Sequence, residues 1–433
     1  MLKSIKKESL VTNVTVKTFG CRLNSYESQL IRESFPNYGK KKLDRFHVIN
    51  TCNVTNEAVR QARQAIRKIH REYPGNKILV TGCAAQIAPE LFAKMPEVDL
   101  VIGNREKIDP DIFSSLVLQY PKDKKIFVKN IFTGKNTYPP LIRNFHERSR
   151  AFLQVQQGCD YRCTFCVIPF SRGNSFSIPY DHIFKQIQIF LDKGFKEIIL
   201  TGVDLTSYGK DLKNKLRLGD IVEKILYDFP ELKRLRISSL DPAAIDSKLK
   251  NLLISEDRIM PHVHLSIQSG DNIILKRMKR RHSREQVIKL CSDLIKKRKG
   301  ITFGADLIVG FPTETENMFQ NTLKIVAQSK LTFLHIFPFS PRSGTPASKM
   351  PQVSGTVVKE RLSRLRDMSY KALRFSMNSL IGKKVSVLLE KEKWGRCESY
   401  FPVKIDKVGK IGNVLSASIT DYSADGELEA KVN

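Results

Sequence analysis

Short apolar runs alternate with amphipathic helical patterns along the first part of the chain. This pattern predicts strands that alternate with helices, and the short loops between them favour a parallel, doubly wound sheet. The expected strands are Val14–Phe19, Phe46–Asn50, Ile78–Thr81 and Leu100–Ile102, and the expected helices are Ser25–Phe35, Glu57–Glu72 and Ala88–Met95. We expect this N-terminal domain to span residues 10–122, followed by a charged, proline-containing linker at residues 123–147.

A second alternation of strands and helices fills the middle of the chain. Apolar runs separated by amphipathic stretches predict an α/β barrel, open or closed, of the partial TIM type. The expected strands are Phe152–Gln156, Glu197–Leu200, Leu235–Ser238, His262–Ile267, Thr302–Val309 and Leu334–Pro338, and the expected helices include Tyr180–Lys193, Gly219–Phe229, Arg284–Arg298 and Glu316–Gln328. We expect this domain to span residues 148–376.

The pattern changes again at about Ser379, where apolar and polar residues begin to alternate between glycine-containing turns. This alternation predicts a small all-β module over residues 377–433. Its expected strands are Lys384–Leu389, Phe401–Asp406 and Val414–Asp421. The predicted fold class is therefore α/β, with an N-terminal sheet domain, a central barrel and a β module at the end.

Composition agrees with a folded chain of several domains. The 433 residues are 41% hydrophobic and 27% charged, which argues against global disorder. The longest apolar runs fall well short of the ~18 residues of a membrane span. Lys3, Lys6 and Lys7 are not followed by the apolar segment of a secretory signal. We therefore expect a cytoplasmic protein with no membrane association.

Positive charge is the strongest compositional deviation. Lys and Arg number 73 against 44 Asp and Glu, a formal net charge of +29. The excess is +13 in residues 1–150, +15 in residues 151–375 and only +1 in residues 376–433. Such an excess favours a polyanionic partner such as a nucleic acid. The alternative is a lysine-rich surface that serves solubility alone.

Three cysteines share one short segment, Cys159, Cys163 and Cys166, with the spacing CxxxCxxC. Iron–sulfur clusters are held by thiolates at such spacings. A four-iron cube on three cysteines leaves one iron open to a small molecule. A zinc site would need a fourth ligand, and the nearest histidines, His146 and His182, lie outside the loop. The spacing therefore predicts a [4Fe–4S] cluster.

A second set of cysteines has a regular spacing but no short motif. Cys21, Cys52 and Cys83 lie 31 residues apart, and each directly follows a predicted strand. The ends of parallel strands share one sheet edge, so the three side chains could converge there. Gly20 and Gly82 would let the backbone pass close to a bulky group. The spacing leaves open the alternative of three half-buried packing residues.

Local sequences carry a family resemblance. The CxxxCxxC loop after a first barrel strand resembles the radical S-adenosylmethionine (SAM) superfamily. The segments around the first three cysteines resemble the N-terminal domain of the methylthiotransferases, and later segments are similar to that family's blocks in the expected order. The first group is Thr18–Asn24, Asn50–Thr55 and Thr81–Gln86, and the later group is Gln157–Gly173, His264–Gly270, Asp306–Pro312 and Pro338–Pro346. The tail resembles a short TRAM module.

The resemblance implies two [4Fe–4S] clusters and SAM as cofactors. The cluster on Cys159, Cys163 and Cys166 would bind SAM and cleave it to a 5′-deoxyadenosyl radical. The auxiliary cluster on Cys21, Cys52 and Cys83 would deliver sulfur, methylated by a second SAM. A reductant such as flavodoxin or ferredoxin and a sulfur donor are implied as partners. The cofactors carry the chemistry and the protein orients them.

Within the family, Gly20–Glu27 and Ser340–Pro346 most resemble the branch that acts on N6-threonylcarbamoyladenosine (t6A). That branch adds a 2-methylthio group at tRNA position 37, in the anticodon loop, where unstacking an adenine costs little. The alternatives are the isopentenyladenosine branch, a ribosomal-protein aspartate branch and, from another class, a non-catalytic RNA-binding protein with structural zinc. Gln157 and Asn174–Ser177 depart from the family pattern, which puts substrate contacts near the loop in doubt.

Several polar residues at barrel strand ends are candidate contacts of SAM. The resemblance places Gly202, Val203 and Asp204 near its amino group. Further candidates at the following strands are Ser238, Ser239, Gln268, Ser269 and Asp306. The alternative is that these residues cap helices and shape turns.

Other features have both a binding and a structural interpretation. The basic runs Lys276–Arg284 and Lys359–Arg374 could neutralise tRNA phosphates or form solvated helix faces. Trp394, Tyr400 and Phe401 could stack an unpaired base or pack in a core. Cys291 and Cys397 are expected to be packing residues.

Overall fold

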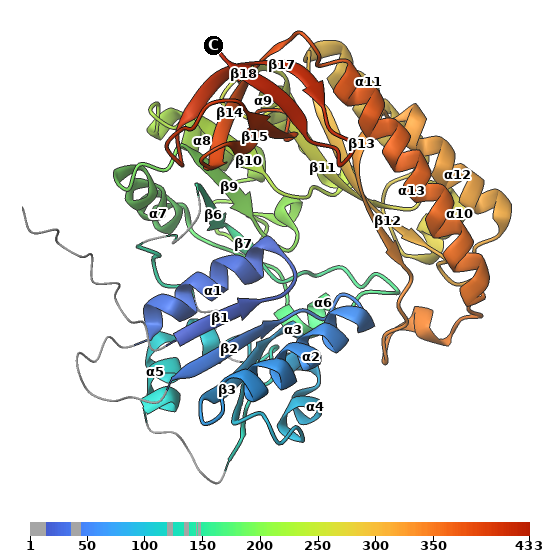
Figure 1. The fold of residues 1–433 in the computed structure, drawn as a ribbon. Helices are drawn as coiled ribbons and strands as arrows, with labels where there is room; N and C mark the ends of the chain where they lie inside the picture. Colours follow the sequence, from blue (N-terminus) through green and yellow to red (C-terminus); the bar gives the residue numbers. More distant parts are fainter. Residues whose placement is uncertain (1–13, 36–44, 119–123, 134–137, 144, 146–148) are drawn as a thin grey trace, which may run out of the picture. The chain divides into compact units, whose positions relative to one another are not determined.

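The structure is a computed structural model that describes residues 14–35, 45–118, 124–133, 138–143, 145 and 149–433 (Figure 1). The chain divides into two compact units, residues 1–142 and residues 143–433. Among the described residues, no helix has the length and apolar character needed to cross a membrane.

The first unit is built on a parallel sheet. Its described strands follow the order β1-β2-β3-β4-β5, each parallel to its neighbours. They are β1 (Val14–Thr18), β2 (Phe46–Thr51), β3 (Lys77–Gly82), β4 (Leu100–Ile102) and β5 (Ile126–Phe127). The helices between them are α1 (Arg22–Ser34), α2 (Asn56–Glu72), α3 (Cys83–Ile87), α4 (Pro89–Ala93) and α5 (Pro110–Leu118).

The sequence explains where these elements begin. All six positions of β2 are buried, as expected for a strand covered on both faces. Helix α2 begins at Thr55, whose side chain accepts a hydrogen bond from the Ala58 amide at 3.1 Å. Three elements of this unit were not predicted: α3, α5 and β5. Strand β5 lies inside the expected linker 123–147 and pairs with β4. Two apolar residues are too few to show a strand periodicity.

The second unit contains the predicted partial barrel, in two described halves. The strand orders are β10-β9-β6 and β11-β12-β13, and all of these pairs are parallel. Single bridges, Leu235 with Ile259 and Leu240 with Leu265, join the halves. The strands are β6 (Arg150–Gln154), β9 (Glu197–Thr201), β10 (Arg234–Ile237), β11 (His262–Gln268), β12 (Thr302–Val309) and β13 (Leu331–Pro338).

Helices follow the barrel strands, as the alternating pattern predicts (Figure 1). They are α6 (Ile168–Arg172), α7 (Tyr180–Asp192), α8 (Leu218–Asp228), α9 (Ser247–Ser255), α10 (Asn272–Arg277), α11 (Arg284–Lys297), α12 (Glu316–Gln328) and α13 (Gly355–Asn378). A short antiparallel pair, β7 (Gln156–Gln157) with β8 (Phe176–Ser177), stands directly before and after the three-cysteine loop. This pair brings the two ends of the loop together.

The last part of the second unit is the expected all-β module. Its described strands close into a barrel in the order β14-β15-β16-β18-β17. They are β14 (Lys384–Lys391), β15 (Trp394–Cys397), β16 (Pro402–Ile405), β17 (Val414–Tyr422) and β18 (Leu428–Val432). Strands β15 and β18 were missed in the sequence because each is short. Cys397 and Phe401 are buried in the core of this small barrel, so both are packing residues.

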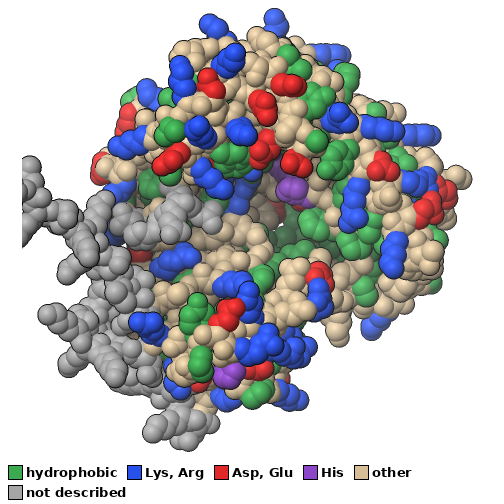
Figure 2. All heavy atoms as spheres, in the orientation of Figure 1, with side chains coloured by type: hydrophobic (Ala, Val, Ile, Leu, Met, Phe, Trp, Pro, Cys, Tyr) green, Lys and Arg blue, Asp and Glu red, His purple; other side chains and the backbone are tan. Residues whose placement is uncertain are grey.

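Lys and Arg side chains are spread over the visible face of the molecule rather than gathered in one patch, with acidic side chains among them (Figure 2). The charge excess is therefore distributed broadly on this face. A distributed positive field attracts a polyanion over a wide area.

Candidate cluster and cofactor sites

The three-cysteine loop is held tightly at its start. Gly158 has a φ of 68°, and a Cβ added there would lie 2.0 Å from the carbonyl oxygen of Asn174. The Cys159 amide donates to the Gly173 carbonyl at 3.1 Å. Only glycine allows the two segments to approach so closely. Gly173 and Asn174, which follow α6, are thus packed against Gly158 and Cys159.

Polar contacts also tie the loop to segments distant in sequence. Thr164 receives a hydrogen bond from the Ala347 amide, and its hydroxyl donates to the Arg277 carbonyl at 2.8 Å. The Arg162 guanidinium donates to the Cys159 carbonyl and to the Asn174 side chain, both at 2.9 Å. Asn174, one of the departures from the family pattern, therefore has a structural role in this chain.

Burial and mutual charge govern the thiols of this loop. Burial and, to a smaller extent, the carboxylate of Asp204 raise the pKa of Cys159 to about 12. The charges of Cys163 and Cys166 also raise the pKa of Cys159, so the sulfurs are close enough to interact. Burial likewise raises the pKa of Cys166 to about 12. A coordinated metal reverses this balance, because it deprotonates a ligating thiol outright.

Gln156 connects the loop to the next barrel strand. Its amide nitrogen donates to the carbonyls of Gln157 and Gly158 and to the Ser175 hydroxyl, at 2.8–2.9 Å. Its oxygen accepts from the Val203 and Asp204 amides, at 2.9 and 2.8 Å. The side chain is completely buried. Gln156 was not predicted as a site residue, because a glutamine at a strand end carries no recognisable motif.

The expected contacts at the second strand thus lie beside the loop. Gly202 packs on Gln156, and an added Cβ there would meet its side-chain oxygen at 2.9 Å. Asp204 lies near enough to influence Cys159, and it accepts hydrogen bonds from the hydroxyls of Thr206 and Ser207. The turn predicted to face SAM and the three-cysteine loop therefore belong to one hydrogen-bonded unit.

The remaining candidates at strand ends differ from one another. Ser239 is exposed after β10, whereas Ser238 is buried with its hydroxyl 3.4 Å from that of Thr201. Gln268 ends β11 with a φ of 75°, a left-handed conformation rare outside glycine and often found at functional sites. Ser269 is fully buried, and its hydroxyl accepts from the Asp271 amide, which makes it a turn residue.

Asp306 lies within β12, as expected from the predicted strand Thr302–Val309. Its carboxylate contacts His264 and His335 on the neighbouring strands. Sequence analysis named Asp306 but missed both histidines as its partners.

The first basic run, residues 276–284, is partly exposed and partly engaged in internal contacts. Arg280 lies 3.8 Å from the Cys163 sulfur and donates to the Ser266 carbonyl at 2.7 Å. Arg281 pairs with Asp241 at 2.9 Å and stacks over the Tyr161 ring. Arg280 and Arg281 therefore contact the three-cysteine loop, whereas Lys276, Arg277 and Lys279 are exposed, and contact with tRNA phosphates stays a prediction for them. A guanidinium beside the loop offsets the negative charge of thiolates.

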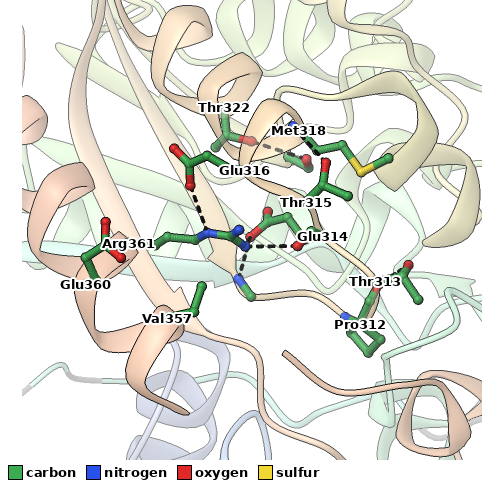
Figure 3. Close-up of polar contacts among 12 residues, drawn as sticks. Pro312, Thr313, Glu314, Thr315, Glu316, Met318, Thr322, Val357, Glu360 and Arg361 are labelled. Atoms are coloured by element: carbon green, nitrogen blue, oxygen red, sulfur yellow. Dashed lines mark hydrogen bonds and ion pairs between the residues drawn. The ribbon is translucent and has the colours of Figure 1, made fainter. Parts of the chain in front are cut away.

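The second basic run is partly internal too. Arg361 on α13 is buried and pairs with Glu314 at 3.0 Å, with Glu316 next to it (Figure 3). Arg364 pairs with Glu316 at 2.6 Å. These bonds join α13 to the segment that follows β12. The exposed part of the run is Lys359, Arg366, Lys371 and Arg374.

The aromatic residues of the β module also divide between two roles. The Tyr400 ring stacks on His262 of the barrel with centroids 4.6 Å apart, and Phe401 is in the core. Both are therefore packing residues. Trp394 is half-buried beside a cavity of about 580 Å³ lined with three lysines, Lys391, Lys393 and Lys404. Of the three aromatic residues, Trp394 keeps the features of a base-stacking site.

In the first unit, the turns that carry the other three cysteines touch one another. A Cβ added to Gly20 would lie 2.8 Å from the Cys52 sulfur, so the turn before Cys21 packs directly on Cys52. A Cβ at Gly82 would lie 2.3 Å from the carbonyl oxygen of Thr51, next to Cys52. Both glycines have positive φ, 92° and 97°. Both glycines are therefore needed where one turn packs against the next, and their approach to a bulky group stays a prediction.

A buried polar network supports this edge of the sheet. Asn24 donates to the carbonyls of Phe19 and Thr51, at 2.7 and 3.0 Å, and so connects the first two turns. Asn50 donates to the Asn24 carbonyl and accepts from Lys107. Lys107 pairs with Glu27 at 2.6 Å, and both side chains are buried. Sequence analysis missed Glu27 and Lys107, which are 80 residues apart.

Both cysteine sets fit an iron–sulfur cluster by the chemistry of their donors. All six cysteines are free thiols. Glycine turns beside both sets leave no room for a side chain, so the backbone packs closely around the thiols. The other two cysteines, Cys291 and Cys397, are buried, and burial raises the pKa of Cys291 to about 12. As expected, these two are packing residues.

Two family profiles match the chain. The radical SAM superfamily matches residues 153–326, and the uncharacterized protein family UPF0004 matches residues 13–103. Each match covers one of the two cysteine sets. Among solved structures, the radical S-adenosylmethionine methyltransferase TsrM from Kitasatospora setae is similar in fold, with a TM-score of 0.54 at 14% identity, covering 72% of this chain and 65% of that one.

Curated relatives match over nearly the whole length. Threonylcarbamoyladenosine tRNA methylthiotransferase MtaB of Rickettsia prowazekii is 47% identical, covering 93% of this chain and 94% of that protein. The protein of that name from Aquifex aeolicus is 36% identical, covering 93% and 99%. The tRNA-2-methylthio-N(6)-dimethylallyladenosine synthase of Pelagibacter ubique is 32% identical, covering 97% and 98%. On this full-length similarity, the chain belongs to the radical SAM methylthiotransferase family.

Proposed function

We propose that this enzyme installs a 2-methylthio group on t6A at position 37 of tRNA. The observation that carries the proposal is the presence of two separate cysteine sets, each gathered at glycine turns, in a chain similar to the MtaB enzymes. The t6A substrate is preferred to dimethylallyladenosine because relatives named for t6A reach 47% and 36% identity, against 32% for those named for the alternative.

We assign Cys159, Cys163 and Cys166 to one [4Fe–4S] cluster and SAM, and Cys21, Cys52 and Cys83 to an auxiliary [4Fe–4S] cluster. When bound, these groups supply radical chemistry on SAM and the sulfur that is inserted. The domain boundaries proposed are those of the sequence prediction, with the auxiliary site in residues 10–122, the SAM site in residues 148–376 and the TRAM-like module in residues 377–433.

The chain's own residues position these groups. Gln156 fixes the backbone of the turn Gly202–Asp204 relative to Cys159, so the surface offered to the SAM amino group cannot shift independently of the loop. Arg280 places positive charge beside Cys163. Gln268, Ser239 and Asp306 remain proposed SAM contacts, and Ser269 supports the turn that presents Gln268.

The substrate proposed is the anticodon loop of tRNA. Lys391, Lys393 and Lys404 make the groove beside Trp394 positively charged. The lysines suit the phosphate backbone of the RNA, and the Trp394 ring suits an unpaired base. A second groove, of about 230 Å³, is lined by Arg60, Arg63 and Arg67 on α2. A reductant such as flavodoxin or ferredoxin and a sulfur donor complete the partners, in the cytoplasm.

The substrate is tested by mass spectrometry of tRNA nucleosides from a deletion strain. Loss of the 2-methylthio form of t6A, with restoration by the wild-type gene, is expected. A deletion strain that loses only the methylthiolated dimethylallyladenosine would contradict the proposal. Loss of a methylthio group from a ribosomal protein, with tRNA unchanged, would show instead that the enzyme belongs to the protein-modifying branch.

A further inference from the structure

One arginine connects the three-cysteine loop to the ends of two barrel strands. Nη1 of Arg280 lies 3.8 Å from the Cys163 sulfur, to which it donates. Its Nη2 donates to the carbonyl of Ser266, in β11, at 2.7 Å. The same Nη2 lies 3.4 Å from a carboxylate oxygen of Asp241, which follows β10. Arg280 is therefore held from two strands, while one donor of its planar fork serves a cysteine of the loop.

Burial makes this positive charge effective. The Arg280 side chain is only 9% exposed, and its Nε is buried without a hydrogen-bond partner among the described residues. A buried N–H that has no partner costs free energy. Its presence fits a position beside a negatively charged group, which the thiolates and sulfides of an iron–sulfur cluster would supply. Electrostatic interactions are stronger in such a buried position than at the surface.

The nearby carboxylate of Asp241 does not cancel the charge of Arg280. Asp241 also pairs with Arg281 at 2.9 Å, and His282 Nδ1 lies 3.7 Å from its other oxygen. Burial opposes the charge of Asp241, but its contacts with His282 and the two arginines hold its pKa well below its usual range. One carboxylate thus serves two arginines, and this group of side chains keeps a net positive charge next to Cys163.

A positive charge beside a cluster ligand favours the reduced form of a cluster over the oxidised form. Reduction adds an electron, and a nearby cation stabilises the added negative charge. An N–H that donates to a ligand sulfur acts in the same direction, and hydrogen bonds to the sulfurs are among the factors that set the reduction potentials of iron–sulfur clusters. Both effects are combined in the contact between Arg280 and Cys163.

We propose that Arg280 raises the reduction potential of the cluster on the three-cysteine loop, so that a carrier such as flavodoxin or ferredoxin can reduce it. The carrier gives up one electron, the cluster gains that electron, and Arg280 keeps its protons and its bonds. This inference rests on the proposed function, because it takes Cys163 as a cluster ligand. Asp241 and Ser266 hold the guanidinium in place and are positioning residues for this role.

The reduction potential is measured on the reconstituted holoenzyme by a redox titration monitored by EPR. Each sample is recorded before and after SAM is added, and the component that SAM changes is the loop cluster. Arg280→Gln should lower the equilibrium constant for reduction of this cluster about tenfold, which is about 59 mV for a one-electron couple. Arg280→Lys keeps the charge without the planar fork and should lower the constant by about threefold.

Lys279→Gln is the matched control, because it removes an exposed positive charge one residue away from Arg280. Solvent screens that charge, so the constant should change by less than about twofold. Iron content and SAM cleavage separate the proposed role from a structural one. Arg280→Gln should keep about eight irons. Its SAM cleavage should fall about tenfold with reduced flavodoxin but less than about threefold with excess dithionite, because a stronger reductant compensates for a lower potential.

An unchanged potential in Arg280→Gln would overturn the inference, and weaker SAM binding in that variant would then assign the guanidinium to SAM instead. Equal loss of SAM cleavage with both reductants would also overturn it. If Arg280→Gln does not assemble the loop cluster, Arg280→Lys carries the test, and an unchanged potential there would contradict the inference. A wild-type enzyme without a SAM-sensitive cluster would overturn the proposed function and this inference together, whereas activity on dimethylallyladenosine alone would overturn only the substrate.

Discussion

The fold positions the two sets of three cysteines in different ways. Cys159, Cys163 and Cys166 lie within eight residues of one another, on a loop whose shape depends on hydrogen bonds from distant segments. Cys21, Cys52 and Cys83 are brought together by the register of three parallel strands. The loop site is local in sequence and needs support from elsewhere, whereas the sheet site is distributed in sequence and supported by its own fold.

This difference predicts which substitutions should disrupt each site. The loop depends on polar side chains such as Gln156 and Arg162 that fix its backbone. The sheet edge depends on glycine turns and on a buried ion pair beneath them. Substitutions outside the cysteines should therefore damage the two sites through different mechanisms.

The largest effect should come from replacing Cys159, Cys163 and Cys166 with alanine. Reconstituted wild-type protein should hold about eight irons, because each set suits a four-iron cluster. The variant should keep about half of them and lose SAM cleavage entirely. Iron analysis and measurement of 5′-deoxyadenosine test this expectation. Continued SAM cleavage by the variant would show that the loop is not the radical site.

Gly82→Ala tests the sheet edge without touching a thiol. A Cβ at Gly82 would lie 2.3–2.4 Å from backbone atoms of Thr51, so the strand ends must move apart. Displacement of this size should lower methylthiolation by about a hundredfold. Gly75→Ala is the matched control, since Gly75 has a similar φ of 86° but open space around it. If both variants lose activity equally, backbone strain rather than close approach is responsible.

Lys107→Met tests the buried support of the sheet edge. It leaves Glu27 buried without its cationic partner, which should lower the free energy of unfolding by about 3–5 kcal/mol. Lys77→Met is the control, because the pair of Lys77 with Asp99 is partly exposed and should be worth about 1 kcal/mol or less. Urea unfolding of both variants measures the difference. Equal destabilisation would mean that burial of the first pair has no special importance.

Gln156→Leu should have the smallest effect and be confined to the loop site. The substitution removes contacts with two backbone amides and two carbonyls while keeping a similar volume. We expect SAM cleavage to fall about tenfold, with the iron of the sheet site retained. Measuring SAM cleavage and iron per chain separates the sites. Loss of iron from both sites would argue that Gln156 serves general folding.

The fold was largely predictable because its strands are buried and its helices amphipathic. Strand β2 shows the signal at its strongest, since every position is buried. Most of the elements missed are short, such as β5 with two residues and β15 with four, although α5 has nine. Helix α3 begins at Cys83 itself, where the apolar strand before it leaves no separate helical pattern.

The candidate sites were predictable only where the chemistry is local. The CxxxCxxC spacing identifies the loop cysteines, and their positions just after predicted strands identify the sheet cysteines. Basic residues did not reveal their partners, because Arg280 and Arg361 look like surface charges until the fold places them in buried contacts. The pairing of Lys107 with Glu27 and of Asp306 with two histidines depends on strand register, which a single sequence does not encode as a motif.

The central claim, that the two cysteine sets divide the labour, is tested most directly by one variant. Cys21, Cys52 and Cys83 are replaced with alanine, and 5′-deoxyadenosine and methylthiolated tRNA are measured in the same anaerobic reaction. The account predicts that SAM cleavage continues while methylthiolation is lost. Equal loss of both products, with the fold intact by circular dichroism, would contradict the division of labour and leave the sheet cysteines with a structural role only.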